Sequence, residues 1–118
     1  MANEGRTISM LIGRVASAVC FVMDYVEFHF DGPILRSLSN PVVTFRGNEW
    51  SFPSPGSRDA LCSVIGAKVE SVEVEDDASI WVRFDSGHAI MVPLDAGSRV
   101  GPEAAHFVSE ADHVMDVW

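Results

Sequence analysis

The chain has 118 residues, of which 47% are hydrophobic, 21% charged and 9% aromatic, a composition typical of one globular domain. Scattered glycine and proline, together with ample branched apolar residues, exclude collagen, a coiled coil and bulk disorder. The 17 acidic and 8 basic residues give a formal net charge of −9 without any lysine or arginine cluster, so nucleic-acid binding is disfavoured.

The acidity lies almost wholly in the second half of the chain. Residues 60–118 carry 11 acidic and 3 basic side chains, whereas residues 1–59 are nearly balanced. A solvated surface is the simpler interpretation. A docking face for a basic partner is the alternative, because a concentrated electric field steers association.

The compartment is predicted from what the sequence lacks and from its cysteines. No apolar run is long enough to span a membrane, and the first residues have no features of a secretory signal. Cys20 and Cys62 lie among apolar neighbours, so we expect reduced, buried thiols, with a disulfide between them as the alternative. These features predict a cytoplasmic protein.

The first predicted element is a short helix from Ile8 to Ile12, with Thr7 as its cap and Gly13 as its stop. The next stretch, residues 15–22, is apolar at both odd and even positions. This pattern predicts a strand that is covered on both faces.

Alternation then marks two longer strands, at residues 25–31 and 79–85, each followed by a glycine turn. The side chains predicted to be buried are Val26, Phe28, Phe30, Ile80, Val82 and Phe84. Residues 46–49 (Arg-Gly-Asn-Glu) predict a further hairpin turn. We therefore expect antiparallel pairing.

A second short helix is predicted between the strand-rich halves. Ser57 is the expected N-cap and Gly66 the stop, and Leu61, Val64 and Ile65 form one apolar face.

An acidic run follows this helix, at residues 70–77. Calcium binding is one interpretation, because calcium takes several oxygen ligands. The alternation of valine with glutamate favours the other, in which the acids decorate the solvated face of a strand and the turn after it.

The chain also resembles itself. Residues 11–13 (Leu-Ile-Gly) align with residues 64–66 (Val-Ile-Gly), and a strand ending in Phe-Asp-Gly or Phe-Asp-Ser-Gly follows each. We expect a single domain, 1–118, with pseudo-repeats of about 7–53 and 57–118 and internal pseudo-twofold symmetry; chance similarity between β-rich segments is the alternative. The predicted fold class is α+β, mainly antiparallel β-sheet as a sandwich or half-open barrel with two short helices.

The outward faces of the two equivalent strands provide the candidate binding residues. These are Tyr25, Glu27, His29, Trp81, Arg83 and Asp85. Aromatic and arginine side chains are enriched at interfaces. Trp81 needs a cover, which could be another part of the chain, a homodimer contact, or a ligand or partner seated in a cleft.

Histidines offer the few candidates for chemistry. His29 lies between Glu27 and Asp31 and could act as a general base or metal ligand, although a solvated strand face is the simpler interpretation. His88 follows a glycine and is expected in a turn. No nucleophile elbow, phosphate-binding loop, dinucleotide fingerprint or zinc motif occurs, so no catalytic residue, cofactor or metal is predicted.

Three short motifs give the sequence a resemblance: Ile-Gly-x-x-Val early in the chain, Phe-Asp-Gly after a strand, and residues 101–107 (Gly-Pro-Glu-Ala-Ala-His-Phe). With them the chain resembles small acidic bacterial proteins of uncharacterised function, some of which are similar to immunity proteins of toxin systems. The resemblance implies a bacterial cytoplasmic origin and favours protein binding. It carries over no functional residue.

Two functions follow as hypotheses. The first is a non-enzymatic protein-binding protein, immunity-like and self-associating as a homodimer, with a basic protein as a further partner. The second is a small-molecule binding domain or modest enzyme whose cleft lies between the two halves, with Glu27, His29, Arg83 and Asp85 as its polar groups.

Overall fold

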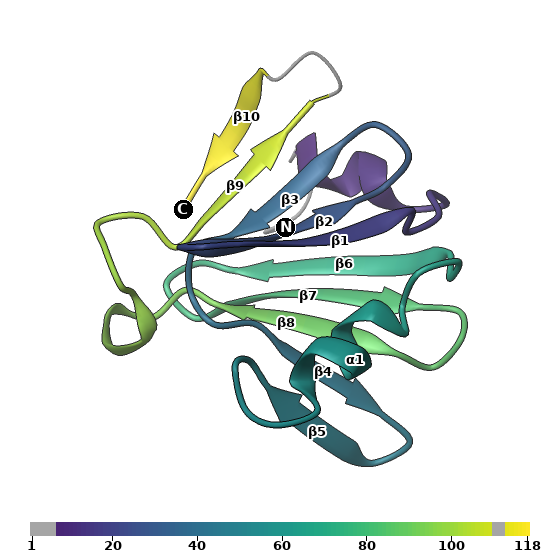
Figure 1. Cartoon of the computed structure of the whole chain (residues 1–118). Coiled ribbons are helices and arrows are strands. Elements are labelled where there is room, and N and C mark those ends of the chain that lie inside the picture. Colours follow the sequence, from purple (N-terminus) through teal and green to yellow (C-terminus); the bar gives the residue numbers. More distant parts are fainter. Residues whose placement is uncertain (1–6, 110–112) are drawn as a thin grey trace.

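Two five-stranded antiparallel sheets make up the fold in the computed structural model, which describes residues 7–109 and 113–118 (Figure 1). The first sheet has the order β1-β2-β3-β9-β10, with β1 Ala18–Val22, β2 Tyr25–His29, β3 Ile34–Ser37, β9 Ala105–Val108 and β10 Val114–Val117. The second has the order β5-β4-β8-β7-β6, with β4 Val42–Phe45, β5 Asn48–Ser51, β6 Val69–Glu75, β7 Ser79–Phe84 and β8 Ala89–Pro93. The helical segments are short: η1 Thr7–Leu11, α1 Ser57–Cys62 and η2 Ala96–Ser98. A mainly antiparallel β fold is thus confirmed, and a sandwich is consistent with it.

The alternating side chains of β2 and β7 meet in the core. All six apolar positions predicted from the alternation are buried: Val26, Phe28, Phe30, Ile80, Val82 and Phe84. The rings of Phe30 and Phe84 stack with their centroids 6.4 Å apart. Since the apolar side chains of both strands enter one core, the polar side chains between them point to the two outer faces.

Each sheet contains strands from both halves of the chain. The hairpin β4–β5 joins the second sheet beside β8, and the hairpin β9–β10 joins the first sheet beside β3. Two backbone hydrogen bonds also link the two halves of the chain in a reciprocal way. Gly13 N–H of the first half donates to Val69 O (2.9 Å), and Gly66 N–H of the second half donates to Ala16 O (2.8 Å).

The prediction of a doubly covered strand over residues 15–22 was wrong. The strand β1 begins only at Ala18 and lies at the edge of its sheet. On the inner side Val19 packs against the core and Phe21 stacks on Phe52, whereas Val22 on the outer side is exposed. On that outer side Ala18 and Cys20 are only partly buried, so an apolar sequence on both faces does not mean full burial of both.

The helical segments differ from the predicted ones. The N-terminal segment is a 3₁₀-helix, and the cap of α1 is Gly56 in the left-handed conformation, with Ser57 as the first buried helical residue. Ser57 was therefore wrongly predicted as the N-cap. Because α1 ends at Cys62, Ile65 lies beyond it and is exposed. No helix within the described ranges is long and apolar enough to cross a membrane.

Both cysteines carry free thiols, as expected, and the alternative disulfide is not formed; the side chains are only partly buried. Burial raises the pKa of Cys62, and the nearby negative charge of Asp59 raises it further. The Cys62 thiol is therefore protonated at neutral pH.

Candidate functional site

The six predicted site residues divide between two outer faces and a turn. Tyr25, Glu27 and His29 point outward from β2, Trp81 and Arg83 point outward from β7, and Asp85 lies in the turn after β7. The buried side chains of both strands lie between the two groups. The polar residues Glu27, His29, Arg83 and Asp85 therefore do not converge on one cleft, contrary to the second hypothesis.

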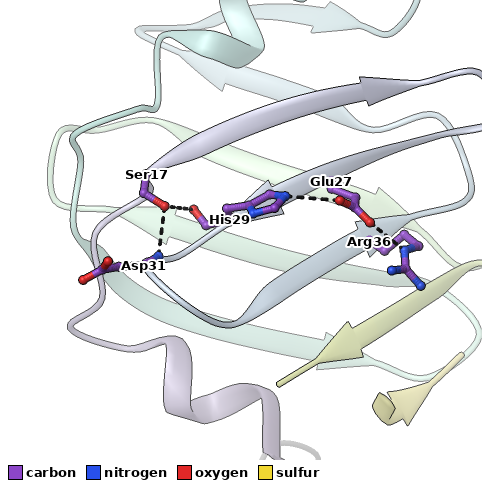
Figure 2. A network of polar contacts seen from close by, with 5 residues as sticks. All are labelled: Ser17, Glu27, His29, Asp31 and Arg36. Carbon is purple, nitrogen blue, oxygen red and sulfur yellow. Dashed lines mark hydrogen bonds and ion pairs between the residues drawn. The ribbon is translucent and has the colours of Figure 1, made fainter. Parts of the chain in front are cut away.

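A row of polar side chains crosses the outer face of the first sheet, and three of its members are shown in Figure 2. Glu27 accepts hydrogen bonds from His29 Nε2 (3.1 Å) and from Arg36 Nε (2.9 Å). Arg36 also contacts His106 Nδ1 (3.2 Å), whose Nε2 lies 2.7 Å from Glu103 Oε1. We call these five residues the outer polar row. They meet because Glu27, Arg36 and His106 are direct neighbours in the strand register.

Two carboxylates, those of Glu27 and Asp31, were predicted to flank His29. Of these two, Glu27 contacts the imidazole, whereas Asp31 lies beyond the end of β2 with φ of 54°. The Asp31 N–H donates instead to Ser17 Oγ (3.0 Å), and Ser17 donates to the His29 carbonyl (Figure 2). Among the residues that the structure describes, no group of three His, Cys, Asp or Glu could hold a metal ion.

On the opposite outer face, Trp81 is half-buried, and it lines with Arg83 a depression of about 410 Å³. The Arg83 guanidinium lies over the indole, 4.9 Å from the ring centroid, and also pairs with Glu73 of β6. Glu73 and Glu75 are exposed and alternate with buried Val74, as predicted. The ring therefore keeps a half-buried position within one chain.

An apolar groove opens beside Tyr25, between the β1–β2 turn and the loop that joins β8 to β9, which stands away from the sheets at the left of Figure 1. Its two adjoining parts hold about 280 Å³ and about 210 Å³. Its apolar lining consists of Met23, Tyr25, Val26, Leu38, Phe52, Val100 and Pro102, and its acidic residues are Asp24 and Glu103. We call it the Met23–Val100 groove.

The two residues that name the groove are unusually exposed. Met23 is 97% exposed and Val100 82%, more than any other large apolar side chain in the described ranges. Both lie in turns and not in strands, so no neighbouring strand covers them. Sequence patterning missed them because isolated apolar residues in turns carry no periodic signal.

The groove and the outer polar row form one continuous surface. Tyr25 lines the groove, and the guanidinium of Arg36 lies over its ring at 5.3 Å. Glu103 ends the row and also lines the groove. This surface combines apolar anchors, an aromatic ring and hydrogen-bonding groups that are already oriented.

A second depression, of about 540 Å³, lies between the hairpin β4–β5 and the segment around α1. Its lining consists of Phe45, Trp50, Gly56, Asp59, Ala60, Ser63 and His88, and we call it the His88 pocket. The residues come from both halves of the chain. His88 is buried and stacks on Phe45 with ring centroids 3.9 Å apart. As expected, it lies in the connection before β8, but its burial was not foreseen, although it shares the inward parity of Ile90 and Val92.

Hydrogen bonds fix the chemistry of His88. Ser63 donates its hydroxyl proton to Ala60 O, so His88 Nε2 donates to Ser63 Oγ (3.1 Å), while Nδ1 accepts from Ser86 Oγ (2.7 Å). Burial lowers the pKa of His88, and the positive charge of Arg46 lowers it further. The ring is neutral, and it is not placed to take a proton from Ser63, as a nucleophile–base pair would require.

Comparison of the chain with models of protein families, with curated proteins and with solved structures finds no match.

Proposed function

We propose that the chain is a non-enzymatic, immunity-like binding protein of the cytoplasm that takes an extended segment of a basic protein partner into the Met23–Val100 groove. The observation that carries this proposal is the nearly complete exposure of Met23 and Val100 beside a preformed apolar depression. The two free thiols are in keeping with a reducing compartment.

Apolar burial supplies the affinity in this proposal. Covering one large apolar side chain contributes about 1.5–3 kcal/mol, and Met23 and Val100 both line a depression that an apolar side chain of the partner can fill. Methionine adapts its shape to different partners, which suits the rim of such a groove.

Charge selects the partner. Asp24 and Glu103 lie in the groove, and the whole chain carries a formal net charge of −9. Lysine or arginine on either side of the apolar anchor therefore gains attraction on approach, with a dependence on salt. A second copy of this acidic chain is repelled from the same groove.

Selection of short random peptides displayed on phage tests the proposal. We expect enrichment of peptides with an apolar anchor flanked by lysine or arginine, and loss of their binding to the double variant Met23→Ser, Val100→Ser. Val114→Ser is the matched control, because Val114 is exposed on β10 but does not line the groove. Enrichment of acidic peptides, or equal binding to both variants, would reject the groove.

Self-association is proposed for the other outer face. Arg83 and Glu73 form an ion pair beside Trp81. In a twofold contact between two copies, Arg83 of each copy can therefore pair with Glu73 of the other copy. Sedimentation should then show a dimer that Trp81→Ala converts to a monomer. A monomeric native protein would refute this contact.

We also propose that the pseudo-repeats 7–53 and 57–118 are a true internal duplication with exchanged hairpins. The equivalent bonds of Gly13 and Gly66 support it, as do their φ angles of 89° and 95°. Alanine at either position should destabilise the protein equally, by about 1–2 kcal/mol, because both require the left-handed conformation. Unequal losses in urea unfolding would argue against equivalence.

A further inference from the structure

We infer that the His88 pocket binds an organic cation, an ammonium group carried on an aromatic or aliphatic body. This site is separate from the Met23–Val100 groove and does not depend on the function proposed for that groove. At about 540 Å³ its volume falls within the range that small-molecule sites occupy.

Trp50 supplies the aromatic wall. Gly56 faces the indole without a side chain, and a Cβ placed there would lie 3.6 Å from Trp50 Cδ1, in direct contact with the ring. Any residue other than glycine would therefore cover this part of the indole. The left-handed backbone at residue 56 favours glycine, and glycine leaves the Trp50 ring uncovered at this point. An indole face attracts cations more strongly than other aromatic rings do.

Asp59 supplies the negative charge. Its carboxylate is exposed at the pocket and has no ion-pair or hydrogen-bond partner within residues 7–109 and 113–118. An unpaired carboxylate beside an aromatic wall is the combination that a cation recognises through both charge and ring.

The other residues of the pocket lining add no positive charge at neutral pH. Burial and the positive charge of Arg46 lower the pKa of His88, so its imidazole is neutral at neutral pH, and the serine hydroxyls at its two nitrogens set only the tautomer. Arg46 lies over the Phe45 ring at 4.9 Å and is not part of the pocket lining. Phe45 thus has Arg46 and His88 against its ring, which leaves Trp50 as the wall open to a ligand.

Nuclear magnetic resonance titration of the native chain with benzyltrimethylammonium tests the inference, with benzoate as the oppositely charged probe. The Trp50 indole N–H signal, assigned by its loss in Trp50→Phe, should shift on titration. We expect the cation to bind at least about tenfold more tightly than benzoate. Equal affinity of the two probes, or no shift at Trp50, would overturn the inference.

Two matched carboxylate variants separate a specific site from general attraction to an acidic protein. Asp59→Asn should weaken benzyltrimethylammonium binding by about fivefold, the effect of one partly exposed ion pair. Asp24→Asn removes an equal charge from the Met23–Val100 groove and should leave this affinity unchanged. Equal losses in both variants would mean unspecific attraction and would reject the pocket, whatever the outcome of the peptide selection.

Discussion

Replacing Glu27 by glutamine tests whether the outer polar row stabilises the first sheet. The carboxylate accepts one hydrogen bond from Arg36 and one from His29. Glutamine has the same shape, but its NH₂ group is itself a donor and faces one of these two donors. The amide oxygen can still accept from Arg36 but without the charge, and the NH₂ group can bond to His29 only if the ring changes tautomer and accepts at Nε2.

The magnitude follows from the burial of the three side chains. Hydrogen bonds to charged groups contribute about 1.5–3 kcal/mol, whereas exposed ion pairs contribute about 0.2–1 kcal/mol. The side chains are 14% exposed for Glu27, 24% for Arg36 and 28% for His29, which places them between these limits. We expect Glu27→Gln to lower the free energy of unfolding by about 1–2 kcal/mol.

Urea unfolding of Glu27→Gln, Arg36→Gln and the double variant measures this effect. The double variant should lose less than the sum of the single losses, because both changes break the same interaction. Glu73→Gln is the control, since the Glu73–Arg83 pair is 63% and 42% exposed and should contribute less than about 0.5 kcal/mol. Additive losses at Glu27 and Arg36, or an equal loss at Glu73, would refute the reasoning.

Three further predictions follow from the buried groups. The unfolded chain protonates His88 at a higher pH than the folded chain, because the folded structure lowers the pKa of this side chain. The free energy of unfolding should therefore fall as the pH drops below 6.5, the ordinary pKa of histidine, by at most about 1.4 kcal/mol per pH unit. In urea unfolding between about pH 5 and 8, His88→Gln should lose the part of this pH dependence that His88 causes. Phe30→Ala, which leaves a cavity against Phe84, should cost about 3–5 kcal/mol in the same assay, and a loss below 1 kcal/mol, the size of a surface change, would contradict the stacked core. Alkylation of Cys62 by iodoacetamide should be faster in Asp59→Asn, because loss of the carboxylate lowers the thiol pKa. An unchanged rate would show that the Asp59 charge does not raise the pKa of Cys62.

Sequence patterning was sufficient for strands such as β2 and β7 because each of these two keeps a strict period of two. In β2 and β7 every second side chain enters the core, and the turns after them contain glycine. It failed at residues 15–22, where an apolar sequence does not report whether a second layer exists. On the outer face of the edge strand β1, Ala18 and Cys20 are partly buried and Val22 is exposed.

The candidate site was predictable only in part, since strand register and loop position are long-range properties. Tyr25, Glu27 and His29 were found from alternation, whereas Arg36 and His106 join them only through the pairing of β3 with β2 and β9. The Met23–Val100 groove depends on a loop that brings residue 100 beside the β1–β2 turn. No local pattern encodes that approach.

Titration of the isotope-labelled protein with a short synthetic peptide tests whether the Met23–Val100 groove takes an apolar anchor. The peptide has a leucine–phenylalanine anchor between arginine and lysine residues. We expect chemical-shift changes confined to the groove and the adjoining residues Tyr25 and Arg36, and an affinity that falls as salt is added. Replacement of the peptide's anchor by serine should abolish these changes. Shifts spread evenly over the acidic strand β6, or equal binding of the serine peptide, would contradict a groove that takes an apolar anchor.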